Sequence, residues 1–540
     1  MQISNYIGIL KREFRGYNLT SFRMDLLAGI TCTAVALPLA LAFGVSSGAD
    51  AASGLICAIL AGIIIGTLSG ASYQISGPTG AMAAILVSLS GQYGLQGVFA
   101  ASFLSGIILL LFAFMKAGKL VSFIPKPVVT GFTSGIAIII ALGQIDNAFG
   151  TASRGTDAVS KLMSYAELGF HPSLSVAGIT LLSAAIMILW PKRLNRIFPG
   201  SLLAIIAALI LEMAFSFDVP VVGAIPRTLL PSERLMLSSL SPSYLASFIA
   251  PALSIALLGM IESLLCGASG AKMKGEKIDS TQELYAQGIG NAIIPFFGGI
   301  PATAAIARTS VAIKSGGQTR LVSVIHSIGL LLSMFLLGPY MARIPLSALA
   351  GVLIVTAWRM NEWKAIKAMM RHRIKTSIAQ YFITMIATVV FDLTTAILIG
   401  IGISMILFTL RMTRDLSIEI DDADIPGSPV PTRIAYIDGA LFFGTQERIL
   451  KAVEKMRNDG AKRIILSFRG VSVIDHSEAE ELEEVFLRSK ADGIDVYLCG
   501  LSGDTARIFE RLDMDFYRSS SYSSVIACLE ALGLPGVRID

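Results

Sequence analysis

The chain has 540 residues, of which 54% are hydrophobic and only 15% are charged, and its mean hydropathy is +0.70. This balance excludes an ordinary soluble protein of this length and is typical of a chain that crosses a membrane many times. The net charge of +5 is better explained by basic cytoplasmic loops than by binding to nucleic acid. The five cysteines are scattered, which argues against a disulfide framework or a zinc site.

Apolar runs predict an all-α membrane domain of about fourteen segments at residues 24–410, after a cytoplasmic N-terminus of residues 1–23. An even number of segments predicts that both termini lie in the cytoplasm. The expected segments are 24–45, 51–70, 78–90, 95–115, 125–146, 175–191, 199–216, 247–266, 284–297, 302–314, 319–339, 345–360, 375–391 and 392–410.

The positions of Lys and Arg support this topology, because such residues are enriched in cytoplasmic loops. The predicted cytoplasmic loops are basic, for example at Lys272, Lys274 and Lys277, whereas the predicted outer loops hold few such residues. The last two segments flank Asp392, which is interpreted as an interfacial charge, a helix cap or part of a gate.

Two of the segments, 78–90 and 302–314, are too short to cross a membrane, since a full span needs roughly 20 residues. A Gly and a Pro stand at or just before the start of each, at Gly77-Pro78 and at Gly299 and Pro301, and very small residues follow. Interrupted apolar segments are tolerated at membrane depth where they line a cavity, and a pair of them indicates the binding site of a transporter. We therefore expect two half-helices whose N-terminal ends face each other across an anion.

An internal repeat is also visible. Pro78 precedes Pro125 by 47 positions, and Pro301 precedes Pro345 by 44. The stretch that begins at Ile124-Pro125 has a counterpart at Ile344-Pro345, and each stretch ends in Gly. The expected repeats, about 24–216 and 247–410, hold seven segments each, and an odd number predicts that the second is inverted. A chance recurrence in a Gly-rich membrane sequence is the alternative.

The character of the chain changes after Arg411. A charged, Pro-rich linker is expected at 411–431, followed by a small cytoplasmic α/β domain at 432–540. The predicted strands are Thr432–Ile437, Ala440–Phe443, Arg463–Phe468 and Asp495–Cys499, and the predicted helices are 446–458, 477–490, 503–512 and 522–532.

The chain resembles the SulP family of sulfate permeases and solute-carrier-26 anion transporters along nearly its whole length. The stretches 124–132, 261–266, 283–291 and 297–309 carry this resemblance, and 464–477 is similar to the central strand and turn of a STAS domain. The resemblance implies a seven-plus-seven inverted repeat, an elevator-like motion and often a homodimer. The middle of the chain is similar to bacterial C4-dicarboxylate carriers, although sulfate and bicarbonate carriers share much of the pattern.

The anion site is expected to consist mainly of backbone N–H groups at the two half-helix starts, where small side chains let an anion approach the backbone. The alternative is that small residues only allow close helix packing. The predicted residues are Thr79, Gly80, Ala81, Ala304, Ala305 and Ala307.

Two charged residues stand out in apolar surroundings, where ionisable groups are costly and usually functional. Arg308 is predicted to attract the anion or to balance its charge. Glu262, the only acidic residue of the run 247–266, is predicted to couple transport to a proton or to set the charge balance. A structural ion pair between the two is the competing interpretation. The resemblance further implies that Phe43 lines the substrate pocket.

In the predicted STAS turn, His476 and Glu478 flank Ser477, which favours a plain turn and helix cap over a phosphorylated serine. The sequence shows no pattern of an enzyme and predicts no cofactor apart from a coupling proton or sodium ion.

The favoured function is therefore secondary active transport of a small inorganic or carboxylate anion, by symport or exchange, in the inner (plasma) membrane. A passive anion channel, a ligand-binding membrane sensor and a nucleobase carrier of the same fold are the alternatives.

Overall fold

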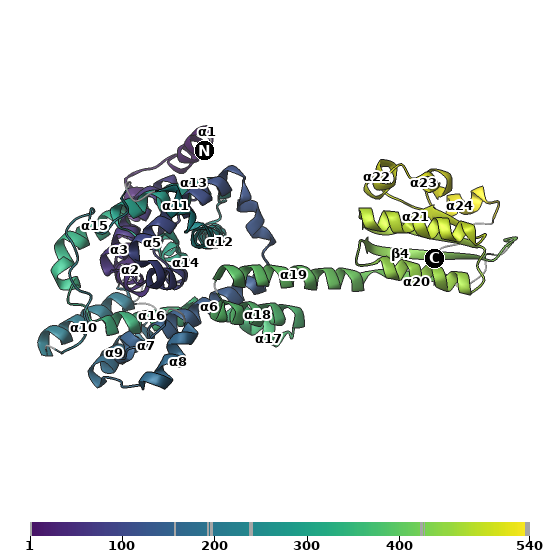
Figure 1. Cartoon of the computed structure of the whole chain (residues 1–540). Coiled ribbons are helices and arrows are strands. Elements are labelled where there is room, and N and C mark those ends of the chain that lie inside the picture. Colours follow the sequence, from purple (N-terminus) through teal and green to yellow (C-terminus); the bar gives the residue numbers. More distant parts are fainter. Residues whose placement is uncertain are drawn as a thin grey trace. The chain divides into compact units, whose positions relative to one another are not determined.

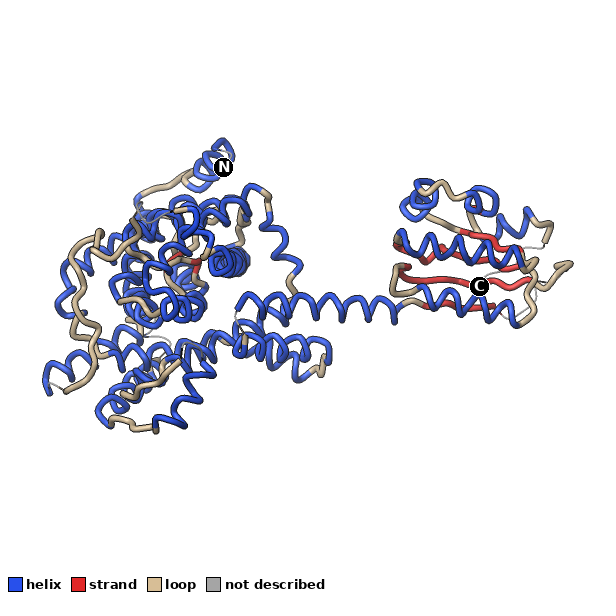
Figure 2. The backbone as a smooth tube through the Cα atoms, in the orientation of Figure 1, coloured by secondary structure: helices blue, strands red, loops and turns tan. Residues whose placement is uncertain are grey.

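A computed structural model describes residues 3–155, 158–191, 194, 198–215, 217–236, 241–391, 393–421, 425 and 427–534. The chain forms two compact units, Met1–Ile401 and Gly402–Asp540. The first is helical and the second contains a five-stranded sheet (Figures 1 and 2). The all-α membrane domain and the α/β tail expected from the sequence are both confirmed. Asp392 lies outside the described residues.

The helices of the first unit follow the apolar runs closely. They are α1 (Ile3–Glu13), α2 (Leu19–Ser46), α3 (Ala51–Leu60), η1 (Ala61–Ile65), α4 (Gly66–Leu68), α5 (Gly80–Phe114), η2 (Ala117–Phe123), α6 (Lys126–Gly143), α7 (Ile145–Phe149), α8 (Ala158–Leu168), α9 (Leu174–Leu189), α10 (Gly200–Phe215), α11 (Pro242–Ala246), α12 (Ile249–Lys274), α13 (Ser280–Ile293), η5 (Ile294–Phe297), α14 (Ile306–Lys314), α15 (Leu321–Met341), α16 (Leu346–Met360), α17 (Trp363–Arg371), α18 (Lys375–Val390) and α19 (Leu393–Asp415).

Each of the fourteen expected segments coincides with one of these helices or with part of one. Among the described residues, seven helical stretches are long and apolar enough to cross a membrane, and α9, α10 and α16 are shorter but also apolar. The N-terminal segment differs from its expectation: residues 3–13 form the amphipathic helix α1, and α2 begins at Leu19. The amphipathic pattern of α1 has too few apolar residues to resemble a span.

The two short segments are half-helices, as expected. The long helix α5 is two helices joined at Gly94, whose φ of 65° lies in the left-handed region that favours glycine. Its first half therefore runs from Gly80 only to Tyr93. The second half-helix, α14, has nine residues.

Two of the prolines from which the repeat was predicted occupy equivalent positions, each immediately before a helix. Pro125 precedes α6 and Pro345 precedes α16, both in an extended conformation, with φ of −64° and −63°. A proline in this place fits because its missing N–H is not needed at a helix start. The inversion of the two halves stays a prediction.

Close helix packing around the half-helices depends on glycine. A Cβ added to Gly62 would lie 1.9 Å from the Ser327 hydroxyl of α15, and one added to Gly106 would lie 2.4 Å from the Ala292 backbone nitrogen of α13. Gly62 lies in η1, a single turn of π-helix, and such turns are frequent near functional sites. These contacts bring α3, α13 and α15 against the segments that carry the half-helices.

The second unit is the predicted α/β domain. Its sheet has the order β3-β4-β5-β6-β7, with β3 antiparallel to β4 and the other neighbours parallel. The strands are β3 (Ser417–Asp421), β4 (Thr432–Leu441), β5 (Arg463–Ile474), β6 (Asp495–Cys499) and β7 (Ser521–Tyr522), and the helices are α20 (Gln446–Asn458), α21 (His476–Ala491), α22 (Gly503–Arg511), α23 (Asp515–Ser520) and α24 (Val525–Ala531).

Alternating side chains divide this sheet into two buried faces. Leu466 and Phe468 pack with α20, α21 and α22, whereas Ile465 packs with Cys528 of α24 on the other face. Such alternation is what a strand with helices on both faces requires.

Two predictions for the tail were wrong. The expected linker 411–431 contains the end of α19 and the edge strand β3, which pairs with β4. The runs Thr432–Ile437 and Ala440–Phe443 form one strand, β4, whose register shifts on either side of Gly439. The irregular register interrupts the apolar alternation, so the sequence suggested two strands where there is one.

Candidate anion site

The two half-helix starts meet through a short pair of strands inside the first unit (Figure 2). Strand β1 (Ser76–Gly77) precedes α5, and strand β2 (Thr303–Ala304) precedes α14. They are antiparallel, with Ser76 opposite Ala304 and Gly77 opposite Thr303. Segments more than 200 positions apart in the sequence thus begin their helices side by side.

A carboxyl group and two hydroxyl groups converge where these helices begin. The hydroxyl of Thr79 donates to Glu262 Oε2 at 2.9 Å, and that of Thr303 lies 2.7 Å from the same oxygen. The two hydroxyl oxygens are 3.1 Å apart. Glu262 comes from the middle of α12 and is half-buried. The sequence identified Thr79 and Glu262, but not the role of Thr303.

The backbone N–H groups at the start of the first half-helix are enclosed by neighbouring side chains. Thr79 is the N-cap of α5, and its hydroxyl accepts the Met82 N–H at 3.4 Å. Gly80 and Ala81 follow in the first turn, where N–H groups have no acceptor within the helix. A Cβ on Gly80 would lie 3.1 Å from the Phe43 ring and 2.4 Å from Ile140 Cδ1. Phe43 therefore packs at the start of α5 together with Ile140 of α6, and its role in lining a substrate pocket stays a prediction.

The second half-helix differs from the prediction. The Ala304 N–H donates to the Ser263 hydroxyl at 3.2 Å, and the Ala305 N–H donates to the Ile75 carbonyl at 2.9 Å. Both amides are engaged in holding β2 and are not available to an anion. Ala305 caps α14 without a side-chain hydrogen bond, so the first-turn amides of Ile306 and Ala307 remain as donors. The side chains of these two residues are exposed.

The side chain of Arg308 reaches from α14 to the residue that precedes Thr79 at the start of the first half-helix. Its side chain is 1% exposed, and its Nη2 donates to the Pro78 carbonyl at 2.6 Å. Nη1 is buried without a hydrogen-bond partner, and it lies 2.5 Å from the position that a Cβ on Gly77 would occupy. Gly77, with a φ of 154°, therefore leaves the space that the guanidinium occupies, because a side chain at this position would clash with Nη1.

The predicted alternative of a direct Glu262–Arg308 ion pair is wrong. In the part of the chain that the structure describes, Arg308 forms no ion pair with a carboxylate, and Glu262 is held by threonine hydroxyls instead. A buried cation without an ionic partner is unfavourable by itself, so an anion bound nearby would be stabilised.

Polar side chains of α13 hold the extended segments from one side. The Asn291 side chain donates to the Ala302 carbonyl at 3.0 Å and accepts the Ala302 N–H at 2.7 Å. The Gln287 amide donates to the Ser76 hydroxyl and to Glu283. Glu283, Gln287 and Asn291 recur every four residues and so share one helix face, a spacing that could have indicated this role.

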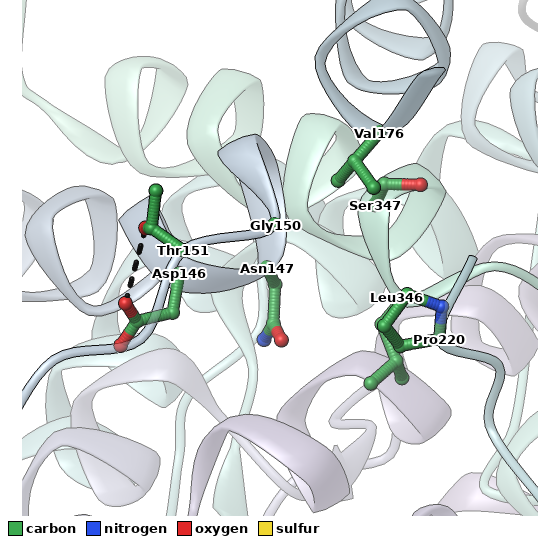
Figure 3. Close-up of a pocket in the computed structure, with 8 residues that line it drawn as sticks. All are labelled: Asp146, Asn147, Gly150, Thr151, Val176, Pro220, Leu346 and Ser347. Atoms are coloured by element: carbon green, nitrogen blue, oxygen red, sulfur yellow. Dashed lines mark hydrogen bonds between the residues drawn. The ribbon is translucent and has the colours of Figure 1, made fainter. Parts of the chain in front are cut away.

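A cavity of about 130 Å³ lies elsewhere in the first unit, between α7, α9 and the start of α16 (Figure 3). Asp146 and Ser347 are among its lining residues. The Asp146 carboxylate accepts the hydroxyls of Thr151, Ser153 and Tyr165 at 3.2, 2.5 and 2.8 Å. Because an acidic side chain repels anions, this cavity is a poorer candidate than the half-helix starts.

Comparison with known proteins agrees with the architecture. Residues 22–406 match the sulfate permease family, and residues 424–525 match the STAS domain. The chain is 34% identical over 516 residues to the putative sulfate transporter YvdB of Bacillus subtilis, covering 92% of this chain and 95% of that protein. It is 27% identical over 539 residues to the bicarbonate transporter BicA of Picosynechococcus, covering 95% of this chain and 93% of that protein.

Solved structures give the same result for the fold. The transmembrane domain of a cyanobacterial bicarbonate transporter, BicA, matches with a TM-score of 0.66 and 28% identity, covering 71% of this chain and 98% of that one. The murine Solute Carrier 26 family member A9 anion transporter in the inward-facing state matches with a TM-score of 0.84 and 17% identity, covering 96% of this chain and 92% of that one.

Proposed function

The chain belongs to the sulfate permease family, and we propose that it is a proton-coupled secondary transporter of a small oxyanion or carboxylate. The relatives compared above are transporters of sulfate or bicarbonate and not enzymes. The candidate substrates are sulfate, bicarbonate and C4-dicarboxylates. The names of the relatives favour the first two.

The single observation that supports this proposal is the convergence of two helix starts on Glu262. Helix N-termini carry unpaired N–H groups and a partial positive charge, which suit an anion. The donors are the amides of Gly80 and Ala81 on one side and of Ile306 and Ala307 on the other. The buried guanidinium of Arg308 adds a full positive charge behind them.

The hydroxyl groups suggest how a proton is coupled to the anion. When Glu262 is ionised, Thr79 and Thr303 both direct their hydroxyl protons to its carboxylate. When Glu262 is protonated, its own O–H becomes a donor, and a threonine hydroxyl is free to turn toward the anion. Protonation also removes a negative charge beside the site. Proton binding and anion binding therefore favour each other, and the coupling is reciprocal.

The transport step is proposed to be an elevator-like movement. The half-helices are fastened to α12 and α13 by Ser263, Gln287 and Asn291, so these elements would move as one body with the anion. The remaining helices, among them α6, α9, α16 and α18, would form the gate, and a homodimer would hold two gates together. The basic loops support a cytoplasmic location for both termini.

Transport by purified protein in proteoliposomes tests the proposal. We expect uptake of sulfate, bicarbonate or succinate to rise as the external pH falls, and an inward proton gradient to drive accumulation. Glu262→Gln should retain downhill uptake but lose both the pH dependence and the proton-driven accumulation. Uphill uptake driven only by sodium, or an unchanged pH profile in Glu262→Gln, would refute proton coupling at Glu262.

The same assay separates the other functions. A passive channel would equilibrate the anion without accumulating it under any gradient. A sensor would bind the anion without transporting it. Deleting the residues after Pro426 should weaken or alter transport but leave it measurable, because the half-helices lie wholly within the first unit.

A further inference from the structure

We propose that Glu283 and Gln287 are positioning residues that fix the start of the first half-helix, and that the N-terminal helix α1 holds them in place through Arg320. This inference rests on the proposed function, since it concerns the geometry of that site. It extends the role of Gln287 to a series of buried hydrogen bonds that continues through Glu283 and Arg320 to α1.

The first link joins α13 to β1. The Gln287 side-chain amide donates to the Ser76 hydroxyl at 3.1 Å and to Glu283 Oε1 at 2.9 Å. Ser76 lies in β1, three positions before Thr79, and it pairs with Ala304 of the second half. A displacement of Ser76 would therefore move both helix starts.

The second link joins α13 to the turn after α4. The other carboxylate oxygen of Glu283 accepts the Ser69 hydroxyl at 2.5 Å and the Gly70 N–H at 3.1 Å. Glu283 is thus completely buried and accepts three hydrogen bonds. A buried carboxylate is tolerated only when its oxygens accept hydrogen bonds in this way. These contacts therefore favour a single arrangement of Glu283 and its partners.

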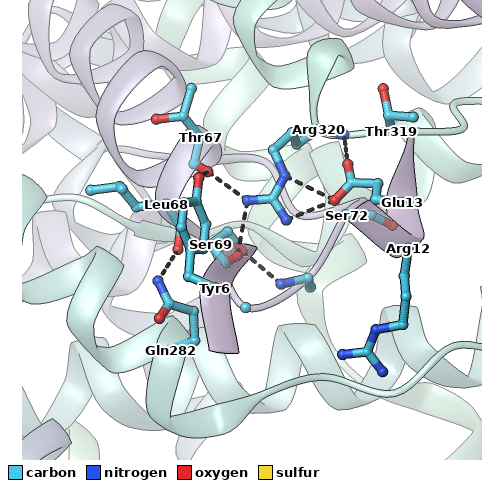
Figure 4. Close-up of polar contacts among 12 residues, drawn as sticks. Tyr6, Arg12, Glu13, Thr67, Leu68, Ser69, Ser72, Gln282, Thr319 and Arg320 are labelled. Atoms are coloured by element: carbon cyan, nitrogen blue, oxygen red, sulfur yellow. Dashed lines mark hydrogen bonds and ion pairs between the residues drawn. The ribbon is translucent and has the colours of Figure 1, made fainter. Parts of the chain in front are cut away.

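The third link joins this turn to the N-terminal helix (Figure 4). Arg320 Nη1 donates to the carbonyls of Thr67 and Ser69. The remaining guanidinium nitrogens, Nε and Nη2, donate to Glu13 Oε2 at 2.9 and 2.7 Å, and the Arg320 backbone N–H donates to Glu13 Oε1 at 2.6 Å. The side chains of Arg320 and Glu13 are each 5% exposed or less. The hydroxyl of Tyr6 in α1 also donates to the Thr67 carbonyl.

These three links form one continuous path from Glu13 to Ser76. Its charged side chains, Glu13, Arg320 and Glu283, are all buried, and Arg320 and Glu283 each hydrogen-bond to Ser69. Removing one of them leaves buried polar groups without a partner. The helix α1 is amphipathic and lies within the region 1–23 that the sequence predicts to be cytoplasmic. It therefore connects the cytoplasmic end of the protein with the anion site.

A donor-reversing exchange gives a sharp test in the full-length protein. In Gln287→Glu two carboxylates face each other, which breaks the path. In Glu283→Gln the Gln287 amide can rotate so that its oxygen accepts from the new amide and from the Ser76 hydroxyl, which keeps the path intact. The double variant E283Q/Q287E restores it, because the amide at 283 donates to the carboxylate at 287, which accepts the Ser76 hydroxyl.

Two readouts are compared for these variants. Hydrogen exchange of the segment 75–83 should become faster in Gln287→Glu and stay near the wild-type rate in Glu283→Gln and in the double variant. The KM for radiolabelled sulfate should rise about fivefold in Gln287→Glu with little change in kcat, as expected when binding geometry is lost. Glu212→Gln, which changes a buried carboxylate on α10 outside the path, is the matched control and should change neither readout.

The outcomes also separate this inference from the proposed function. If the wild-type protein takes up no anion, the proposed function fails, and hydrogen exchange alone judges the positioning role. If the wild type transports sulfate but Gln287→Glu matches it in exchange and KM, the inference is overturned. A double variant that is as impaired as Gln287→Glu would overturn it as well.

Discussion

The two half-helix starts occupy corresponding places in the predicted repeat, yet they are built differently. The start of α5 is buried, capped by the Thr79 hydroxyl and packed beneath Phe43 and Ile140. The start of α14 has no side-chain cap, and its first residues are exposed. Each start thus supplies a hydroxyl to Glu262, but only the first has a side-chain cap and a buried first turn.

Arg308 shows most clearly how the two half-helix starts are connected. It belongs to the second half-helix but donates to the Pro78 carbonyl of the first. One side chain therefore joins the two halves and supplies the site's positive charge. The contact between Arg308 and Pro78 therefore makes the two helix starts depend on each other.

The largest expected effect comes from breaking that connection. Arg308→Ala should lower anion uptake roughly 100-fold, because it leaves Pro78 unpaired and removes the buried charge. Arg308→Lys keeps the charge but not the fork of the guanidinium, so it should retain an intermediate rate. Initial uptake rates in proteoliposomes, normalised to folded protein by size-exclusion chromatography, measure both. Uptake by Arg308→Ala within threefold of the wild type would contradict the role of this residue.

A second, smaller effect should distinguish the two threonines. Thr79→Val and Thr303→Val each remove a hydrogen bond to Glu262, but only Thr79→Val also removes a helix cap. We expect the KM for the transported anion to rise about tenfold in Thr79→Val and about threefold in Thr303→Val, since an N-cap is worth about 1 kcal/mol. Equal effects would show that the cap does not matter for the site.

Enlarging the smallest side chains compares the packing of the two starts. Gly80→Ala should lower the free energy of unfolding by about 1 kcal/mol, because the added methyl group meets Ile140 and Phe43. Ala307→Ser adds one atom at an exposed position and should leave stability unchanged. Thermal unfolding of the two purified variants measures the difference. A destabilised Ala307→Ser would mean that the second start is as tightly enclosed as the first.

The smallest effect concerns a carboxyl group that lacks the two hydroxyl partners of Glu262. Glu478 of the tail is fully buried, has only one long contact, at 3.3 Å from the Thr445 hydroxyl, and leaves its Oε1 without a partner. Burial raises the pKa of Glu478 from 4.5 to about 7. Because the folded state favours the protonated acid, this contribution to stability is complete below pH 4.5 and is lost as the pH rises through about 7.

Hydrogen exchange of α20 and α21 in the full-length protein checks this prediction. Relative to Glu478→Gln at the same pH, the wild type should open more readily at pH 8 than at pH 5.5, by a factor on the order of ten. A ratio that does not change with pH would contradict it.

Much of this architecture is encoded locally and could be predicted. The apolar runs gave the positions of the spans, and Gly and Pro identified both half-helices, because helix breakers act on their own neighbourhood. Glu262 and Arg308 were recognisable since charge is rare in apolar segments. Asp475 caps α21 by accepting the Glu478 N–H, which is the plain turn expected around Ser477.

The rest depends on contacts between distant segments. Whether the Ala304 and Ala305 amides are free is decided by Ser263 and Ile75, which approach only in the folded chain. The direction of the Arg308 side chain depends on space beside Gly77. The edge strand β3 has a charged sequence and is stabilised by pairing with β4, so its own residues did not reveal it.

The central claim, that an anion binds between the two half-helix starts, is tested most directly by protection of a single introduced thiol. All five native cysteines are buried, so Ala307→Cys offers an exposed and selective target for a charged thiol reagent. Lys364→Cys, exposed on α17, serves as the control. We predict that the transported anion, among sulfate, bicarbonate and succinate, slows modification of Ala307→Cys but not of Lys364→Cys. Equal modification rates with and without an anion that the protein demonstrably transports would contradict the account.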